Sequence, residues 1–327
     1  MKCNYCELHC EMPYSACKMY KEENGNIVEI HPGKYSSYHP VKVESIPIYH
    51  LMIDEQLLEV GGFNCNANCD YCINARVATI PSDDLYLFKL EPERIVDIAL
   101  KSNCRGIQFG VNEVTVNLPS AIAVAKLTHE KGLICGASSN GYMTEESAEL
   151  MANNFDYLNI SLKSISDDYY EKYIGLPHVY PIKRNIKFLS KKIHIELTTP
   201  VVQGLNDHEL YSIRDFIYDI DPEMAWHIFR LLPQYKMENQ KNPDIEELTS
   251  IVMEIRKKLP FTYFSNFIGS QLDNSICPVC GEILLERLCI SSCGAILLNS
   301  YMTEDYRCKK CGYKFPIAMI SKGRSNR

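Results

Sequence analysis

The sequence predicts an α/β fold, an open and partial TIM-like barrel built from six strand–helix units, (β/α)6. Short apolar runs alternate with amphipathic helical stretches through the middle of the chain, which is typical of parallel βαβ units. The 327 residues exceed one average domain but suit a single barrel with small additions. Cysteine clusters stand on both sides of this middle part. We therefore expect a Cys-rich N-terminal region at residues 1–50, the partial barrel at 51–270 and a zinc-ribbon-like domain at 271–327.

Six apolar runs mark the expected strands. They lie at residues 57–63, 106–111, 133–138, 157–162, 193–202 and 225–232. Between them, helical patterns occupy 91–102 and 118–131, and a third helix begins near Thr144. Pro92 stands in the first turn of the first helix, where its missing N–H does no harm. Six units within about 180 residues favour an open, partial barrel rather than the full eight.

The N-terminal region is rich in thiols. Cys3, Cys6, Cys10 and Cys17 follow one another at spacings of three, four and seven. Four thiolates so close could form a tetrahedral zinc site or hold a second iron–sulfur cluster, and the alternative is free thiols in a flexible end. We expect metal binding here and leave the metal open. A short hairpin is expected at 24–30.

The overall composition is that of a soluble globular protein, with 46% hydrophobic and 23% charged residues. The net charge of −7 argues against non-specific binding to nucleic acid or to an anionic membrane. The first residues are polar and thiol-rich, so we expect no signal peptide, and no apolar run approaches the length of a membrane span. Fifteen cysteines without such a signal point to metal chemistry in a reducing cytoplasm.

The segment from 62 to 78 contains Cys65, Cys69 and Cys72 at spacings of four and three, with Tyr71 just before the last thiol. Asn, Gly and Asp surround them, so we expect an irregular loop. Zinc knuckles usually offer thiols in two separated pairs, whereas these three share one loop with no fourth nearby. Three thiolates on a four-iron cluster leave one iron open, as a catalytic site requires. The alternative is a structural metal loop or three unrelated thiols.

Polar residues follow the predicted strands where they end, and the ends of parallel barrel strands meet at one face. Asn112 and Glu113 follow the second strand, Asn140 follows the third, and Ser161 and Lys163 end the fourth. Glu113 could engage a ligand amine or could be a solvated loop carboxylate. Lys163 could meet a carboxylate, although most lysines are solvated. Together these residues outline one concave site.

The C-terminal region contains two matching Cys-x-x-Cys-Gly knuckles, formed by Cys277 with Cys280 and by Cys308 with Cys311. Such a pair is typical of a zinc ribbon, since the glycines let backbone N–H groups turn toward the thiolates. We favour structural zinc over an auxiliary cluster. Two further thiols between the knuckles could pack or serve as extra ligands, and the sequence does not choose; they are Cys289 and Cys293.

The chain resembles the radical S-adenosylmethionine (SAM) enzymes related to pyruvate formate-lyase activating enzyme, and within them the AmmeMemoRadiSam branch. The N-terminal cysteines, the PIYHL segment at 47–51 and the three-cysteine loop follow that branch in order. Further matches lie at Asn112-Glu113 with Thr115, at 140–144, at 196–199, at 204–207, at Trp226-His227 and at 233–237. So many ordered matches are more specific than a lone cysteine motif.

The resemblance implies a [4Fe–4S] cluster and SAM as cofactors. Cys65, Cys69 and Cys72 would ligate the cluster, and its open iron would hold the methionine amino and carboxylate groups of SAM. Tyr71 would lie near adenine, Glu113 near the methionine amino group and Lys163 near its carboxylate. The full set of expected cofactor-binding residues is Tyr71, Asn112, Glu113, Asn140, Ser161 and Lys163.

Three residues depart from the activating enzymes. Ser138 and Ser161 stand where those enzymes have two aspartates of a cation site, and Tyr235 stands where they place a histidine that contacts SAM. These changes weaken the inference that the substrate is a glycyl radical enzyme. They leave the three cluster cysteines untouched.

The expected function is that of a radical SAM enzyme. It would cleave SAM to a 5′-deoxyadenosyl radical and abstract hydrogen from a substrate, which could be a protein or peptide. The expected partners are a reductant such as ferredoxin or flavodoxin, and neighbours related to Memo. Two other classes remain open, an iron–sulfur electron-transfer protein and a zinc-ribbon binding module, both without SAM turnover.

Overall fold

The computed structural model describes residues 1–79, 84–290 and 294–318. Its largest sheet has the strand order β12-β11-β10-β9-β8-β7-β5-β4, with β12 and β4 at its two ends. From β5 through β12 neighbouring strands are parallel, and β4 is antiparallel to β5. The strands are β4 (Ser37–Lys42), β5 (Gln56–Gly61), β7 (Gly106–Gly110), β8 (Ile134–Ser139), β9 (Tyr157–Ser161), β10 (His194–Val201), β11 (Trp226–Arg230) and β12 (Thr262–Ser265).

The six predicted strands are all present, but the predicted count is too low. In the described ranges, β12 adds a seventh parallel strand and β4 adds an antiparallel edge. The four buried residues of β12 are too few to show a pattern of their own. The six residues of β4 include Pro40 and none is fully buried, which is typical of an edge strand. The (β/α)6 prediction is therefore corrected to seven parallel strands plus one edge strand.

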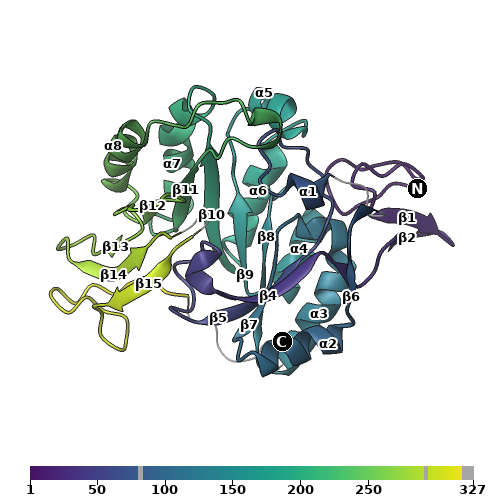
Figure 1. The fold of residues 1–327 in the computed structure, drawn as a ribbon, viewed down its shortest axis with the longest axis horizontal. Helices are drawn as coiled ribbons and strands as arrows, with labels where there is room; N and C mark the ends of the chain where they lie inside the picture. The colour runs from purple at the N-terminus through teal and green to yellow at the C-terminus, as the bar shows by residue number, and fades with distance from the viewer. Residues whose placement is uncertain (80–83, 291–293, 319–327) are drawn as a thin grey trace.

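The helices follow the strands in the order that a βαβ pattern requires, and Figure 1 shows them following one another around the sheet. Helix α4 begins after Thr144, whose Oγ1 accepts a hydrogen bond from the Ser147 N–H at 3.1 Å. The main core lies between sheet and helices and includes Leu58, Ile107 and Leu158, all fully buried. The longer helices are α2 (Pro92–Lys101), α3 (Leu118–Glu130), α4 (Glu145–Asn154), α6 (Tyr180–Leu189), α7 (Leu210–Tyr218) and α8 (Ile245–Arg256), and the short ones are α1 (Ala75–Ala78) and α5 (Asp167–Tyr169).

Small sheets lie at opposite ends of the molecule (Figure 1). The N-terminal hairpin pairs β1 (Tyr20–Glu23) with β2 (Asn26–Glu29). It begins earlier than predicted, because Asn24 and Gly25 form its turn, with φ of 52° and 74°, rather than its first strand. A two-stranded sheet joins β3 (Lys34–Tyr35) to β6 (Phe88–Lys89), and the C-terminal sheet contains β13 (Ser275–Ile276), β14 (Ile283–Leu288) and β15 (Ile296–Ser300).

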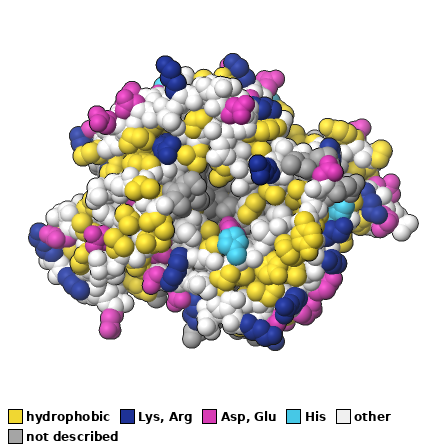
Figure 2. Space-filling model, viewed as in Figure 1, with side chains coloured by type: hydrophobic (Ala, Val, Ile, Leu, Met, Phe, Trp, Pro, Cys, Tyr) yellow, Lys and Arg dark blue, Asp and Glu magenta, His cyan; other side chains and the backbone are white. Residues whose placement is uncertain are grey.

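The surface seen in Figure 2 is hollowed near its middle, with hydrophobic, charged and histidine side chains around the hollow. Acidic and basic side chains are interspersed on this face rather than gathered into one extended patch. Within the described residues, none of the helices combines the length and the apolar character needed to cross a bilayer.

Candidate functional site

The three-cysteine loop lies directly after β5, at the edge of the sheet where the parallel strands end. Residues 62–74 contain neither helix nor strand, as predicted, but the prediction of an irregular loop through residue 78 is wrong at its end, where residues 75–78 form helix α1. Cys65, Cys69 and Cys72 are each partly buried. The Ala67 backbone N–H donates to the Cys65 sulfur at 3.4 Å, a contact that favours a thiolate. The loop therefore presents three thiols at the C-terminal edge of the sheet, where α/β folds place their chemistry.

Backbone hydrogen bonds to neighbouring elements fix the shape of this loop. The Asn68 N–H donates to the Ile174 carbonyl at 2.8 Å, and the Asp70 N–H donates to the Tyr173 carbonyl at 2.9 Å. On the other side, Lys236 pairs with the Asp70 carboxylate at 2.8 Å and donates its own backbone N–H to the Asp70 carbonyl at 3.1 Å. The thiols are thus held by contacts outside the loop, as a preformed cofactor site requires.

Asn112 supports the start of the loop. Its amide donates to the Phe63 carbonyl at 3.0 Å and to the Asn64 carbonyl at 3.1 Å. The approach is so close that a Cβ on Gly62 would overlap the Asn112 amide, so glycine is required there. Asn112 was predicted to bind the cofactor, and in the structure its amide Nδ2 is already engaged by the backbone of the cysteine loop.

The residue before Asn112 has an unusual backbone. Val111 has φ of 71°, a conformation that β-branched residues rarely adopt. The Asn74 side chain, just after the cysteine loop, donates to the Val111 carbonyl at 2.7 Å and helps to hold this geometry. Strained backbone of this kind is concentrated at functional sites.

Glu113 is buried and links the ends of β7 and β8. Its Oε1 accepts hydrogen bonds from the Thr115 N–H at 3.0 Å and from the Ser139 hydroxyl at 2.9 Å, and the Thr115 hydroxyl also contacts it. Its Oε2 accepts from the Asn140 N–H at 2.5 Å. Glu113 therefore has a structural role that the sequence did not indicate. Oε2 makes one hydrogen bond within the described residues and can still accept another.

Asn140 connects the end of β8 to the cysteine loop. Its amide donates to Asn66 Oδ1 at 2.7 Å and approaches the Cys65 sulfur at 3.8 Å. Its own Oδ1 accepts from the Tyr142 N–H at 2.9 Å, which fixes the amide orientation. The structure thus places Asn140 beside the first thiol of the loop.

Lys163 follows β9 and is half-buried. Its backbone is held by the Tyr170 hydroxyl at 3.0 Å and by the Asn206 amide at 2.7 Å. In the described part of the chain, its ammonium makes no ion pair. Burial raises the pKa of the Cys69 and Cys72 thiols, and the positive charge of Lys163 opposes that rise. The structure therefore brings a cation without a carboxylate partner close to two of the three thiols.

Two other predicted residues lie nearby. Tyr71 is buried, and its hydroxyl lies beside the hydroxyl of Tyr169. Ser161 is half-buried at the end of β9, opposite Thr198 of β10.

These residues fit an iron–sulfur cluster that binds an amino-acid ligand. One loop offers three thiols, and the strand ends around it offer a carboxylate oxygen at Glu113, a cation at Lys163 and an amide at Asn140. Three thiolates leave one iron of a four-iron cluster free for a further ligand. Amino and carboxylate groups on such a ligand would be matched by the carboxylate and the cation of the pocket.

The C-terminal knuckles bring four sulfurs together. Those of Cys277, Cys280, Cys308 and Cys311 all lie within 4.8 Å of one another, which suits a single metal ion. The two knuckles repeat each other, since the glycine N–H after each donates to the first cysteine carbonyl at 2.9 Å. A hydrogen bond from the Cys311 backbone N–H helps to lower the pKa of the Cys308 thiol to about 7. Cys289 is buried, and Cys293 lies outside the described residues.

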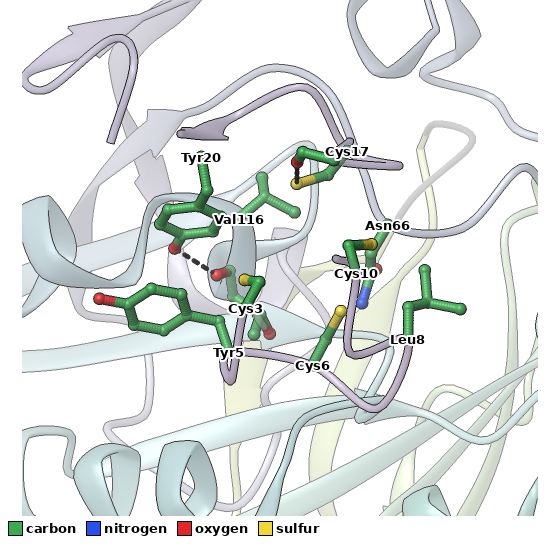
Figure 3. Close-up of a pocket in the computed structure, with 11 residues that line it drawn as sticks. Cys3, Tyr5, Cys6, Leu8, Cys10, Cys17, Tyr20, Asn66 and Val116 are labelled. Carbon is green, nitrogen blue, oxygen red and sulfur yellow. Dashed lines mark hydrogen bonds between the residues drawn. The ribbon is translucent and has the colours of Figure 1, made fainter. Parts of the chain in front are cut away.

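The four N-terminal cysteines line one pocket, shown in Figure 3. Cys3, Cys6 and Cys17 are buried and Cys10 is partly exposed. Asn66 of the cysteine loop lines the same pocket. The structure therefore places the N-terminal thiols beside the loop rather than at a distant end of the chain.

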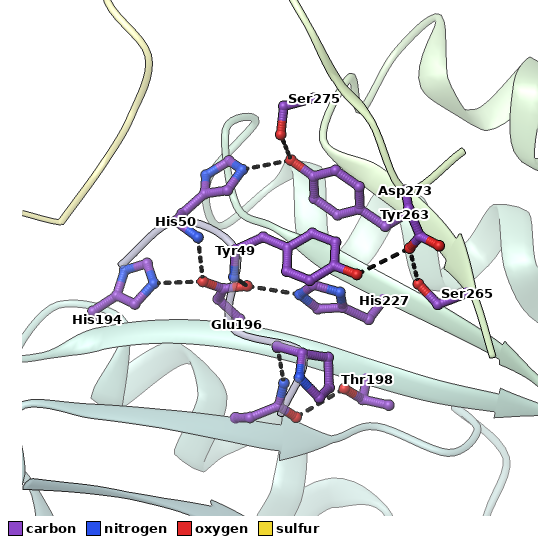
Figure 4. Close-up of polar contacts among 12 residues, drawn as sticks. Tyr49, His50, His194, Glu196, Thr198, His227, Tyr263, Ser265, Asp273 and Ser275 are labelled. Carbon is purple, nitrogen blue, oxygen red and sulfur yellow. Dashed lines mark hydrogen bonds and ion pairs between the residues drawn. The ribbon is translucent and has the colours of Figure 1, made fainter. Parts of the chain in front are cut away.

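A buried polar network that the sequence analysis did not identify lies at the opposite end of β10 (Figure 4). Glu196 accepts hydrogen bonds from the backbone N–H groups of Tyr49 at 2.9 Å and His50 at 2.7 Å, and contacts His194 at 2.9 Å and His227 at 2.6 Å. Burial alone would raise the Glu196 pKa, but the two histidines hold it well below its usual value. His194 and Glu196 alternate with apolar residues along β10, and this alternation is the feature of the sequence that could have revealed the network. The network anchors residues 47–51 to the sheet.

Comparison with known proteins agrees with this geometry. Residues 60–217 match the family model of the Radical SAM superfamily. An uncharacterized protein of Methanocaldococcus jannaschii is 29% identical over 327 residues, covering 98% of this chain and 96% of that protein. A "Probable GTP 3′,8-cyclase" of Methanosarcina acetivorans is 27% identical over 215 residues, covering 61% of this chain and 62% of that protein.

Solved structures share the fold. Streptococcus suis SuiB bound to S-adenosylmethionine aligns with a TM-score of 0.52 and 11% identity, over 70% of this chain and 53% of that chain. This chain spans about half the length of the SuiB structures that it matches. The matched region contains the three-cysteine loop and the strand ends around it. Residues 60–217 therefore match the radical SAM superfamily, a family that implies a [4Fe–4S] cluster and SAM as cofactors.

Proposed function

We propose that this protein is a radical SAM enzyme whose [4Fe–4S] cluster is held by Cys65, Cys69 and Cys72. The observation that carries the proposal is the position of this loop at the strand ends, with the Lys163 ammonium near two of its thiols and no carboxylate paired to it in the described residues. When bound, the reduced cluster and SAM supply a one-electron cleavage of the sulfur–C5′ bond, giving methionine and a 5′-deoxyadenosyl radical that takes a hydrogen atom from the substrate.

The residues around the loop bind and orient. Lys163 provides a positive charge for the methionine carboxylate, and Glu113 Oε2 provides an acceptor for the amino group. Asn112 and Asn140 hold the loop against β7 and β8. The buried Tyr71 ring supplies an apolar surface beside the cluster for adenine.

The finer assignment concerns the subfamily, the substrate, the reductant, the cellular location and the metal of the C-terminal tetrad. We place the protein among the enzymes similar to pyruvate formate-lyase activating enzyme, in the AmmeMemoRadiSam branch, because of the ordered motifs from the N-terminal cysteines to residues 233–237. A protein or peptide substrate, including neighbours related to Memo, follows from that placement. So do a ferredoxin or flavodoxin as reductant and a cytoplasmic location. We also assign zinc to the C-terminal tetrad, because its four sulfurs converge as a single ion requires.

Production of 5′-deoxyadenosine tests the proposal. Anaerobically reconstituted, dithionite-reduced protein should release 5′-deoxyadenosine and methionine from SAM. Replacing Cys65, Cys69 and Cys72 by Ala should abolish release, whereas Cys104→Ala, at a thiol outside the site, should not. Release that survives in the triple variant refutes the assignment. Full iron content without any release in the parent protein would favour the electron-transfer alternative.

A further inference from the structure

The N-terminal cysteines form a built site, because their four sulfurs surround one space. Figure 3 shows the sulfurs of Cys3, Cys6, Cys10 and Cys17 pointing toward it from a single winding segment. The segment is closed on itself, since the Cys3 N–H donates to the Cys10 carbonyl at 2.9 Å. Aromatic and apolar side chains complete the wall and shield it from water, namely Tyr5, Leu8, Tyr20 and Val116.

Each of these sulfurs faces a backbone donor. The Tyr5 N–H donates to the Cys3 sulfur and the Leu8 N–H to the Cys6 sulfur. The Ala16 N–H donates to the Cys10 sulfur at 3.4 Å, and the Met19 N–H donates to the Cys17 sulfur. Hydrogen bonds to the sulfurs are one of the features by which proteins tune an iron–sulfur cluster. The same pattern occurs at Cys65, which accepts from the Ala67 N–H at 3.4 Å. Four sulfurs supplied with donors in this way are arranged as ligands rather than as packing thiols.

The spacing of the sulfurs separates two kinds of occupant. A single zinc ion with Zn–S bonds near 2.3 Å requires sulfurs roughly 3.8 Å apart. The C-terminal tetrad meets this condition, with two sulfur pairs at 3.5 Å and all four sulfurs within 4.8 Å of one another. In residues 1–79, which the structure describes, neither the N-terminal four nor the three thiols of the Cys65 loop converge as a group within 4.8 Å. Sulfurs that line one pocket without converging on a single point suit an iron–sulfur core, in which each thiolate binds a different iron.

We propose that Cys3, Cys6, Cys10 and Cys17 hold a second [4Fe–4S] cluster. Four thiolates ligate all four irons, so this cluster has no open position for SAM and its chemistry is one-electron transfer. It lies next to the cluster of the proposed function, on which this role rests. Asn66 lines the N-terminal pocket, and its Oδ1 accepts a hydrogen bond from the Cys65 thiol at 3.7 Å, so one side chain separates the two sets of sulfurs.

A second contact joins the pocket to the SAM site. The Tyr20 hydroxyl donates to the Thr115 carbonyl at 2.7 Å, and Thr115 in turn holds Glu113. When held by these four cysteines, such a cluster would accept one electron from a low-potential donor such as reduced flavodoxin. It would be reoxidised by passing that electron to the cluster in the Cys65 loop, which would be reduced.

Metal content of a variant without the radical SAM cysteines tests the site. With Cys65, Cys69 and Cys72 replaced by Ala, reconstituted protein should retain about four irons per chain and an electron paramagnetic resonance (EPR) signal that SAM does not alter. Replacing Cys3, Cys6, Cys10 and Cys17 by Ser should remove that signal, and Cys104→Ser should not. Zinc at the N-terminal cysteines, or no iron in the triple variant, overturns the proposal. Cys69→Ala alone repeats the measurement if the triple variant unfolds.

The spin interaction between the clusters tests their proximity. In reduced parent protein the EPR spectrum should differ from the sum of the spectra of the two cysteine variants, because neighbouring paramagnets broaden each other. A spectrum equal to that sum overturns the placement beside Asn66. The two proposals fail separately: iron in the N-terminal site without a SAM response in the parent removes the proposed function and leaves the second cluster standing.

Discussion

Lys163 is the residue whose role is best isolated from folding, because its ammonium makes no ion pair in the described structure. A charged hydrogen bond contributes about 1.5–3 kcal/mol, so Lys163→Ala should weaken SAM binding about ten- to a hundredfold. Isothermal titration of cluster-loaded protein measures this, with Lys187→Ala on the exposed side of α6 as the matched control. Lys163→Arg should restore binding only in part, because the guanidinium is broader and planar. Parental affinity in Lys163→Ala would remove this residue from the site.

Glu113 is a less selective test residue. Its carboxylate accepts hydrogen bonds from Thr115, Ser139 and Asn140, so Glu113→Ala would also loosen the ends of β7 and β8. The sequence placed Glu113 at the site but could not show these bonds, because its partners follow two different strands. Asn112 is a similar case, since its partners are backbone carbonyls of the loop.

His50 predicts how stability depends on pH. Burial lowers its pKa to about 3, against about 6.5 in an unfolded chain, and its Nε2 contacts the Tyr263 hydroxyl at 2.8 Å. The unfolded chain therefore binds one more proton as pH falls below 6.5. Stability from this residue is complete above that pH and falls by about 1.4 kcal/mol per pH unit toward pH 3.

Urea unfolding between pH 7.5 and 5.5 measures this slope. His50→Gln should reduce it relative to the parent, whereas His208→Gln, at an exposed histidine, should leave it unchanged. Any stability that is lost at the metal sites as the pH falls is the same in the parent and in both variants, so it cancels when their slopes are compared. An equal slope in His50→Gln and the parent would show that His50 does not titrate as described.

Among the elements, we expect the C-terminal knuckles to behave as a unit whose stability depends on metal. Metal analysis should find zinc that remains after the iron–sulfur cluster is lost. Cys308→Ser should unfold the surrounding sheet locally, at a cost of at least about 3 kcal/mol, because structural zinc binding is folding free energy. Hydrogen exchange should show β14 deprotected by more than about a hundredfold while β8 is unaffected. Iron in these knuckles, with no zinc even when it is supplied, contradicts the assignment.

The elements also show what the sequence could reveal. Six strands of the large sheet and helices α2, α3 and α4 were predictable because their apolar patterns are strong and local; the strands are β5, β7, β8, β9, β10 and β11. Strand β12 has four residues, and β4 is stabilised by pairing with β5 rather than by its own pattern. The thiols of the cysteine loop were predicted from spacing. The tethers Lys236–Asp70 and Asn68–Ile174 were not, because they join segments far apart in the chain.

For the whole molecule, the sheet brings three cysteine groups into different settings. The Cys65 loop lies at the C-terminal strand ends, and the N-terminal cysteines lie beside it, on the other side of Asn66. The C-terminal tetrad lies in a different apolar cluster, which also contains Tyr49. Arg287 of β14 connects the C-terminal sheet to residues 47–51 through a hydrogen bond to the Tyr49 carbonyl at 3.3 Å. Composition predicted metal chemistry, but only the fold shows which thiols converge on one point and which line a pocket without converging.

The proposed function requires that the cluster of the Cys65 loop has an open iron that binds SAM. EPR spectroscopy of the anaerobically reconstituted, reduced full chain, with and without SAM, detects that binding. A fully ligated second cluster does not respond to SAM, so the difference spectrum isolates the loop. We expect a SAM-dependent change in the signal that is lost in Cys65→Ala and needs more SAM in Lys163→Ala. A spectrum unchanged by SAM, at full iron content in the loop, would contradict it.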